Sequence, residues 1–248
     1  MPVPKVSFVI PVLNLVRPLN KKKFFMPRST VMDLISDIEK NVELDYEIII
    51  ICNNTDKKLI EFATKTPSIS KYVLNSVNPG IARSWNMGVN MAEGEYLFIV
   101  NDDVRIGKNS VEKLIQYMDA NPVVGVTGPR GVLWNKEGHV KYVGESEISI
   151  ADAISGFAFA VRSTAFHDVG GFDINYTPAG CEEIDFSFRT SRSGWTNVVL
   201  PNLDIHHNEH HGISSFRTTI KYFNSEIDTH DLHERNFAYL TNRWFTKP

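Results

Sequence analysis

The stretch Tyr96-Leu97-Phe98-Ile99-Val100-Asn101-Asp102-Asp103 places five consecutive apolar residues directly before an amide and two carboxylates. A short apolar run rich in β-favouring residues predicts a strand that is buried on both faces, as in a parallel sheet covered by helices. Ligands of open parallel sheets bind beyond the carboxyl ends of the strands. This stretch therefore predicts both a fold class and the edge of the sheet where a ligand would bind.

The rest of the first half repeats this order of strand, polar end and helix. Asn14 follows one predicted strand, and the polar turn 53–56 follows another. Apolar residues at i, i+3, i+4 and i+7 predict amphipathic helices between the strands, and such alternation is typical of a parallel sheet with helices on both faces. The predicted elements are strands over 6–10, 47–51, 72–74 and 96–100 and helices over 31–38, 81–91 and 111–118.

The second half is less regular. Turns and short strands are expected over 128–144, a strand over 157–161, a helix over 182–191, and a polar, aromatic helical tail from about 218. We therefore predict an α/β fold with a mostly parallel central sheet, a small antiparallel addition and a C-terminal helical tail. One main domain over 1–217 with the tail 218–248 packed on it is the expected organisation.

Composition narrows the class of protein. The net charge of −3 over 248 residues argues against a nucleic-acid binder, which would usually carry a basic field. Cys52 and Cys181 suggest neither a disulfide framework nor a thiolate metal site, so a reducing cytoplasm is expected. Because no apolar stretch approaches eighteen residues, we expect a soluble protein with at most peripheral membrane contact.

Asp102 and Asp103 are the sharpest chemical feature. Two adjacent carboxylates at the end of a buried strand repel each other, so burial requires a cation or many hydrogen-bond donors. Mg²⁺ or Mn²⁺ would meet this need, because these ions bind through a few carboxylates together with phosphate oxygens. An Asp-rich turn or helix cap is the alternative. The absence of GxGxxG and GxxxxGK[ST] argues against a dehydrogenase and a P-loop NTPase.

At this point the chain resembles the family-2 glycosyltransferases of the GT-A fold, whose sheet is Rossmann-like. The rhamnosyltransferase-like branch, in which the acidic motif often begins with Asn, is the most similar. Six segments match in the family's order over most of the chain: 8–14, 78–88, 96–104, 156–162, 169–173 and 182–189.

The resemblance implies roles at the end of two strands. Pro11 and Asn14 would border the nucleoside pocket. Asn101, Asp102 and Asp103 would be the counterpart of the family's DXD motif. Asp103 would then bind a divalent metal, while Asp102 would face the ribose or the sugar of the donor.

Other positions bear on the nucleotide. Gly80 opens a helix whose free N–H groups would suit an anion, and Arg83 lies one turn in, within reach of a diphosphate; a simple turn at Gly80 is the alternative. Cys52 departs from the Asp with which the family commonly contacts the base. Asn53 or Asp56 would substitute for it, or the base is not uracil.

Glu182 and Glu183 match the family's acidic pair, usually Glu-Asp, at the start of a helix that faces the acceptor. An inverting transfer needs one carboxylate to take the proton of the acceptor hydroxyl. By position this base would be Glu183, with Glu182 and Asp185 as alternatives. Acidic residues also favour a helix N-terminus through its dipole alone.

Residues 206–211 contain four histidines. Imidazoles at this spacing could form a zinc site, although neither cysteines nor an HExxH frame accompany them. The family often carries a His near this point, close to the metal and the diphosphate, which implies that His207 or His211 helps at the donor site. A loop that closes over the donor is the alternative.

The expected function is inverting sugar transfer that depends on Mn²⁺ or Mg²⁺. The donor would be a UDP- or dTDP-linked sugar, and the acceptor a saccharide or lipid-linked saccharide in surface polysaccharide synthesis, in the cytoplasm or at the inner face of the membrane. Two rivals remain. A nucleotidyltransferase would carry a Gly-rich basic loop after the first strand, unlike 14–17. A non-catalytic binding domain is the second rival, because Cys52 and Glu183 depart from the residues that the family usually carries at these positions.

Overall fold

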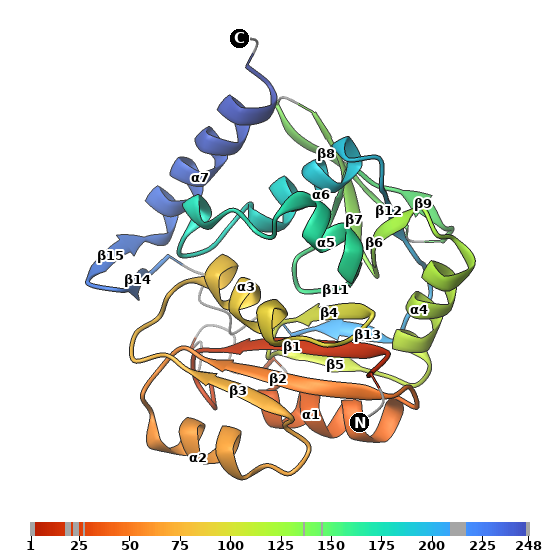
Figure 1. The fold of residues 1–248 in the computed structure, drawn as a ribbon. Helices are drawn as coiled ribbons and strands as arrows, with labels where there is room; N and C mark the ends of the chain where they lie inside the picture. Colours follow the sequence, from red (N-terminus) through yellow and green to blue (C-terminus); the bar gives the residue numbers. More distant parts are fainter. Residues whose placement is uncertain are drawn as a thin grey trace.

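A computed structural model of the protein describes residues 3–17, 21, 25–26, 28–135, 137–144, 146–208 and 217–246 (Figure 1). Its centre is an eight-stranded sheet with the order β3-β2-β1-β4-β11-β6-β12-β9. In chain order these strands are β1 (Val6–Val12), β2 (Tyr46–Cys52), β3 (Lys71–Leu74), β4 (Tyr96–Val100), β6 (Val124–Gly128), β9 (Ser149–Ile150), β11 (Ala158–Arg162) and β12 (Thr196–Val199).

The first four strands of the chain pair in parallel, as β3-β2-β1-β4. Every residue of β1 and β4 is buried, so β4 reads as a continuous apolar run in the sequence and β1 as one interrupted only by Ser7. In the second half β11 runs antiparallel to both β4 and β6, β6 pairs in parallel with β12, and β9 is antiparallel at the edge. The predicted mixed α/β sheet is therefore confirmed.

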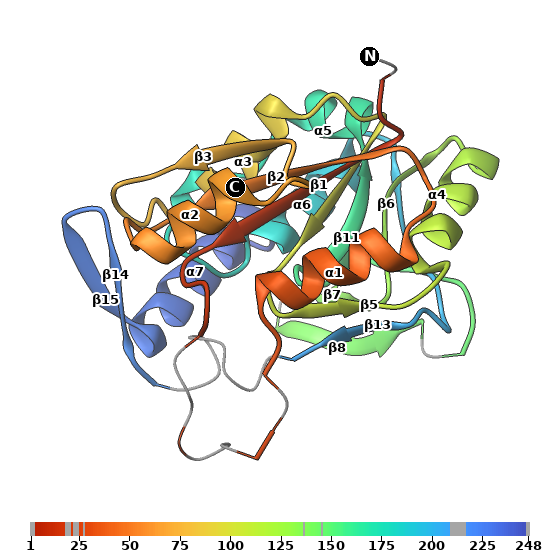
Figure 2. The same cartoon turned by 90° about the horizontal axis from the view of Figure 1, so that it is seen from below.

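Helices cover both faces of this sheet. One core contains residues of α1 (Val31–Asn41), α2 (Lys57–Lys65) and α4 (Ser110–Ala120). Figure 2 shows α1 and α2 lying against that face. A second core, on the opposite face, contains residues of α3 (Ile81–Met91), α5 (Ser163–Val169) and α6 (Glu182–Arg192).

The beginning of α1 shows how local sequence sets these helices. Thr30 is its N-cap, and a capping box joins it to Asp33: the Thr30 backbone N–H donates to Asp33 Oδ2 at 2.8 Å. The residues that the i, i+3, i+4, i+7 spacing assigned to the inner face, Val31, Leu34, Ile35 and Ile38, are all buried.

Short strands complete the second half. β5 (Val104–Ile106) pairs with β13 (Ile205–His207), and β7 (Gly131–Asn135) lies between β8 (Gly138–Val143) and β10 (Ala153–Ile154) in a three-stranded sheet. All of these pairs are antiparallel. They form the small antiparallel addition that the sequence predicts.

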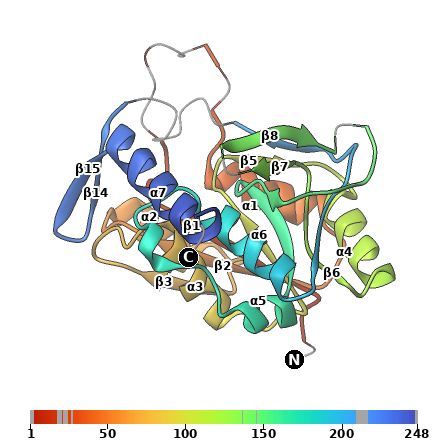
Figure 3. The ribbon, with the colours of Figure 1, turned by 90° about the horizontal axis from the view of Figure 1, so that it is seen from above.

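The C-terminal region differs from the prediction at its start. The hairpin of β14 (Thr219–Tyr222) and β15 (Ser225–Asp228) comes first, and the helix α7 (Thr229–Trp244) begins only after it. Asp228 decides the boundary, because its side chain caps α7 by accepting from the His230 N–H at 2.9 Å. Figure 3 shows α7 lying alongside α6. None of the described helices has the length and apolar character needed to cross a membrane.

Candidate functional site

The predicted ligand edge forms where β4 ends. The Asn101 backbone N–H donates to the Phe157 carbonyl at 2.8 Å, and the Asn101 carbonyl accepts from the Val104 N–H at 3.3 Å. This turn carries Asp102 and Asp103 inward: the residues are only 5% and 1% exposed. Two carboxylates are thus buried side by side, as the sequence predicts.

Arg17 supplies a positive charge to this pair. Its Nη1 lies 2.7 Å from Asp103 Oδ2, and its Nη2 forms an ion pair and hydrogen bond with Asp102 Oδ1. Burial raises the pKa of the Asp102 carboxyl, and the Arg17 guanidinium opposes that rise. Part of the positive charge that the two buried carboxylates require therefore comes from Arg17.

His207 approaches the same carboxylate from the other side. Antiparallel pairing of β13 with β5 sets His207 opposite Val104. Its Nε2 lies 3.2 Å from Asp103 Oδ1, and its ring stacks on Phe157 with centroids 4.8 Å apart and planes at 5°. Of the two histidines predicted for the donor site, His207 meets Asp103, whereas His211 lies outside the described residues.

The side chains around Asp103 suit a small divalent cation. Neither Asp103 oxygen has a hydrogen-bond partner among the described residues, although both lie within ion-pair distance of a cationic group. A carboxylate and an imidazole are two ligands, and phosphate oxygens of a substrate would complete the octahedral set that Mg²⁺ or Mn²⁺ prefers. No group of three His, Cys, Asp or Glu side chains in the described ranges could hold an ion unaided.

Asn53 lies at the end of β2, next to this edge. It is 5% exposed, its Nδ2 donates to Ser84 Oγ at 2.8 Å, and its Oδ1 accepts from Asn75 Nδ2 at 3.1 Å. The preceding Cys52 is fully buried, which raises the pKa of its thiol to about 11. Cys52 is therefore a neutral core residue, and no charge stands where the family commonly has an Asp.

The other predicted nucleotide residues occupy different environments. Pro11 lies in β1 beyond Val9, the last β1 residue paired with β4, so its missing N–H leaves no gap in that ladder. Asn14 is half-buried, two residues after β1. Asp56 is exposed, and its Oδ1 accepts from the Leu59 N–H at 3.0 Å as the N-cap of α2. Its carboxylate therefore already has a structural partner.

At the start of α3, the N–H groups of Gly80 and Ile81 already have acceptors within the chain. The Gly80 N–H donates to Asn78 Oδ1 at 3.0 Å, and the Ile81 N–H donates to the Pro178 carbonyl at 2.8 Å. Gly80 has a φ of +87°, and a Cβ there would lie 2.9 Å from the Pro178 backbone. A glycine is thus required for its backbone conformation and close packing, and the loop around Pro178 covers the start of α3.

Arg83, one turn into α3, is half-buried. Its guanidinium lies over the ring of Phe223, from the β14–β15 hairpin, at 5.5 Å. Its Nε is buried without a hydrogen-bond partner in the described part of the chain. Of the two groups predicted to meet a diphosphate, Arg83 therefore retains an unused donor, in contrast to Gly80.

Glu182 and Glu183 begin α6. Glu182 is 5% exposed, and its Oε2 is buried without a hydrogen-bond partner among the described residues. Glu183 lies over Gly156: a Cβ built on Gly156 would meet the Glu183 Cγ and Cδ at 3.0 Å. Since Phe157, the next residue, accepts from the Asn101 N–H, one short loop connects Glu183 with the Asp102–Asp103 turn.

Burial raises the pKa of both carboxyls of this pair, and the charge of Glu183 raises that of Glu182 further. Hydrogen bonds from the backbone N–H groups of Glu183 and Ile184 oppose the rise at Glu183. Both carboxyls therefore hold a proton more tightly than exposed glutamates do, and they titrate as a pair. A carboxylate with a raised pKa is a stronger base than an exposed one.

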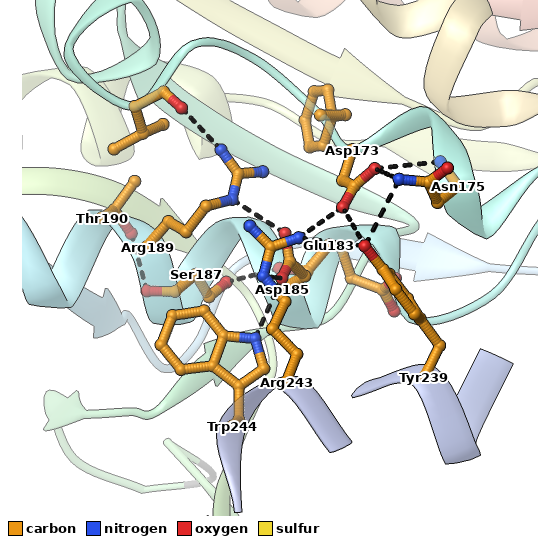
Figure 4. Close-up of polar contacts among 12 residues, drawn as sticks. Asp173, Asn175, Glu183, Asp185, Ser187, Arg189, Thr190, Tyr239, Arg243 and Trp244 are labelled. Carbon is orange, nitrogen blue, oxygen red and sulfur yellow. Dashed lines mark hydrogen bonds and ion pairs between the residues drawn. The ribbon is translucent and has the colours of Figure 1, made fainter. Parts of the chain in front are cut away.

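Asp185, the other alternative for the base, has a different environment (Figure 4). It is 0% exposed; its Oδ2 accepts from Arg189 Nε at 2.8 Å and its Oδ1 from Trp244 Nε1 at 2.9 Å. Arg243 Nε lies 3.3 Å from the same Oδ1. With two arginines and an indole around it, Asp185 joins α6 to α7.

Sequence reasoning missed two residues of this site. Arg17 was not selected, although it lies three residues after Asn14 on the same edge of the sheet, where a cation facing two carboxylates could have been sought. Phe157 was treated only as a strand residue. Its ring supports His207 and its carbonyl holds Asn101, contacts for which the sequence carries no local signal.

The fold and the site together define a GT-A glycosyltransferase class. A crystal structure of GalNAc-T7 with UDP, GalNAc and Mn²⁺ shares the fold, with a TM-score of 0.67 and 17% identity over 83% of this chain and 44% of that one. Residues 28–151, half of the 248, match the family described as Glycosyl transferase family 2. The chain belongs to this family, as its motifs predict.

Two curated relatives are similar over much of the chain. Both are named N-acetylglucosaminyl-diphospho-decaprenol L-rhamnosyltransferase, from Mycobacterium tuberculosis strains CDC 1551 / Oshkosh and ATCC 25618 / H37Rv. Each is 22% identical over 210 residues, which are 70% of this chain and 66% of the relative. The chain therefore spans just under two thirds of their length. Their shared name agrees with the predicted rhamnosyltransferase-like branch.

Proposed function

We propose that this chain transfers a sugar from a nucleotide-diphospho-sugar to an acceptor hydroxyl, with inversion at the anomeric carbon. Membership of glycosyl transferase family 2 supports the reaction class. The observation that carries the proposal is that Glu183 lies over Gly156. The next residue, Phe157, accepts the hydrogen bond from Asn101 that holds the Asp102–Asp103 turn. A candidate base and a candidate cation site thus share one loop.

On the donor side, Asp103 and His207 would hold Mn²⁺ or Mg²⁺ together with oxygens of the diphosphate. The ion would neutralise the charge that develops on the leaving diphosphate, so no general acid is required. Asp102 would face the ribose or sugar, and Arg83 has a buried donor available for a phosphate. Arg17 neutralises the two carboxylates when no donor is bound.

On the acceptor side, Glu183 would accept the proton of the attacking hydroxyl. The oxygen of that hydroxyl then forms the new bond to the anomeric carbon as the bond to the diphosphate breaks on the opposite face. The raised pKa of the neighbouring Glu182 favours the neutral form of that carboxyl, which limits the repulsion that a charged Glu183 meets. The protein's contribution is to hold base, acceptor and donor in line.

The proposed acceptor is a saccharide or a lipid-linked saccharide in polysaccharide synthesis. The names of the two curated relatives support a sugar on a lipid diphosphate and an L-rhamnosyl group to be transferred. The proposed donor is therefore dTDP- or UDP-linked. We place the reaction in the cytoplasm or at the inner face of the membrane, where such a donor would be made.

A thermal-shift screen of nucleotide-sugars with and without Mn²⁺ tests the proposal. A donor at a hundred times its dissociation constant should add about 2.7 kcal/mol to the free energy of unfolding. Transfer to a saccharide acceptor should then be lost in EDTA and return with Mn²⁺ or Mg²⁺. If a nucleotide-sugar bound tightly but was never transferred or hydrolysed, a non-catalytic binding domain would be the correct reading.

A further inference from the structure

The C-terminal helix α7 contacts the backbone just before the acidic pair. Asn236 of this helix is 1% exposed. Its Nδ2 donates to three carbonyls of the loop before α6, those of Tyr176, Ala179 and Gly180, at 2.8, 2.8 and 2.9 Å. A single buried side chain therefore fixes the loop that leads into Glu182 and Glu183.

The orientation of the Asn236 amide is itself fixed. Arg235 Nε and Nη2 donate to Asn236 Oδ1 at 3.1 and 3.0 Å, and Nη2 also donates to the Thr177 carbonyl. Carbonyl oxygens only accept and a guanidinium only donates. One orientation of the amide therefore satisfies every partner, and the reversed orientation satisfies none.

The same helix also contacts the backbone just after the acidic pair. Asp185, two residues beyond Glu183, accepts from Trp244 Nε1 at 2.9 Å and lies 3.3 Å from Arg243 Nε. Figure 4 shows these side chains converging on α6 from α7. Residues of α7 thus hold the chain on both sides of Glu183. Asn236 binds the loop that precedes Glu183, and Trp244 binds Asp185, which follows it.

The segment between the anchors does not hold its shape by itself. Gly180 has a φ of +101° and Cys181 a φ of +71°. The left-handed region disfavours any residue with a Cβ, so Cys181 adopts it only where neighbouring contacts impose it. Two adjacent buried acidic groups also resist being held together. Contacts from outside the segment are therefore needed to keep Glu183 over Gly156.

We propose that α7 positions Glu183 for proton transfer, with Asn236 as the principal positioning residue and Trp244 as a second. This inference rests on the proposed function, in which Glu183 is the base. The C-terminal helix is then part of the working site and not only a tail packed against it. Asn236 touches no substrate; it acts through the loop 176–180.

The test compares Asn236→Ala with Leu240→Ala in the full chain. Leu240 is also on α7 and is 0% exposed, so its truncation weakens helix packing without removing the hydrogen bonds to the loop. Asn236→Ala should lower kcat by about 10²-fold, the effect expected of a displacement near 1 Å, with donor KM unchanged within about threefold. Folded Leu240→Ala should keep its kcat within about threefold.

Hydrogen exchange gives a readout that does not depend on transfer. The backbone amides of residues 176–185 should exchange faster in Asn236→Ala than in the parent or in Leu240→Ala. If Asn236→Ala fails to fold, Trp244→Phe replaces it, because that variant keeps a ring and loses only the bond to Asp185. Its kcat should fall by about fivefold with an unchanged donor KM.

Several outcomes would overturn the inference. Faster exchange in Asn236→Ala with an unchanged kcat would show that these contacts only stabilise the fold. A loss of donor affinity in Asn236→Ala would show that the loop 176–180 acts on the donor side, through its contact with the start of α3. In both cases the parent still transfers sugar, so the proposed function stands. A parent that transfers no sugar at all would remove the proposed function and this inference together.

Discussion

The molecule contains two pairs of adjacent acidic residues, all buried except the half-buried Glu183, and neutralises them differently. At the end of β4, Asp102 and Asp103 meet Arg17, and Asp103 also meets His207. At the start of α6, Glu182 and Glu183 have no cationic side chain within ion-pair distance in the described part of the chain. Burial raises the pKa of both glutamates, as it does that of Asp102, but at the glutamates no guanidinium opposes the rise.

This difference assigns chemistry to each pair. Carboxylates that lie against a guanidinium and an imidazole form a charged, polar site, which suits a cation and a diphosphate. A carboxylate whose pKa is raised by burial, with no cationic side chain beside it, suits the acceptance of a proton.

The largest effect is expected for Glu183→Gln. The amide keeps the shape of the side chain but accepts no proton at neutral pH, so turnover should fall by roughly 10²–10⁴. Donor affinity, measured by calorimetry, should stay within about threefold. Glu182→Gln is the matched control, since it makes the same change in the neighbouring carboxyl, which is not assigned to accept the proton. If Glu182→Gln abolished turnover and Glu183→Gln did not, the base would be Glu182.

Asp103→Ala addresses the other pair. Loss of the carboxylate shared by Arg17 and His207 should weaken Mn²⁺-dependent donor binding by about 10²-fold, while thermal unfolding stays cooperative. Calorimetric titration with donor, with and without Mn²⁺, measures this. An affinity for donor and Mn²⁺ equal to the parent's would place the cation elsewhere.

Gly156→Ala probes the loop that connects the two pairs. The new Cβ would meet the Glu183 side chain at 3.0 Å, and a flexible side chain can move aside at little cost in stability. Displacement of the base should lower kcat by about tenfold. Cooperative unfolding near the parent's melting temperature is expected beside the lower rate. An unaltered kcat would mean that Glu183 does not act from its position over Gly156.

Arg17→Met tests whether the acidic pair at β4 depends on positive charge. Without Arg17 the two carboxylates repel each other, so the melting temperature without metal should fall by several degrees, equivalent to about 1–3 kcal/mol. Added Mn²⁺ should raise the melting temperature of Arg17→Met by more than it raises that of the parent. An equal shift in both proteins would show that Arg17 and the metal do not share the carboxylates.

The smallest effect concerns stability against pH. The folded pKa of Glu182 is raised, so the folded chain binds a proton more tightly than the unfolded chain does. Its contribution to stability is present below the unfolded pKa near 4.5 and is lost as pH rises through the folded pKa. Glu182→Gln should therefore be more stable than the parent at neutral pH, by on the order of 1 kcal/mol. Chemical denaturation at pH 4.5 and pH 8 measures this, and an equal difference at both values would contradict it.

Regular elements were predictable because their signals are local. The helix expected over 81–91 coincides with α3, and the strand over 96–100 coincides with β4. The hairpin of β14 and β15 was missed because each strand is only four residues long and half of these residues are exposed. The acceptor of the Ile81 N–H could not be predicted, because the Pro178 carbonyl that covers the start of α3 lies far along the chain.

The class of the fold and the identity of the two acidic pairs can be predicted from local sequence. Apolar runs report burial on both faces of a sheet, and adjacent carboxylates are visible as neighbours in the chain. How each pair is neutralised and held depends on the packing of distant elements. Arg17 is 85 positions from Asp102, and Asn236 is 56 positions from the Gly180 carbonyl that it binds. No periodicity in a sequence encodes such contacts, because they arise only when separate elements pack against one another.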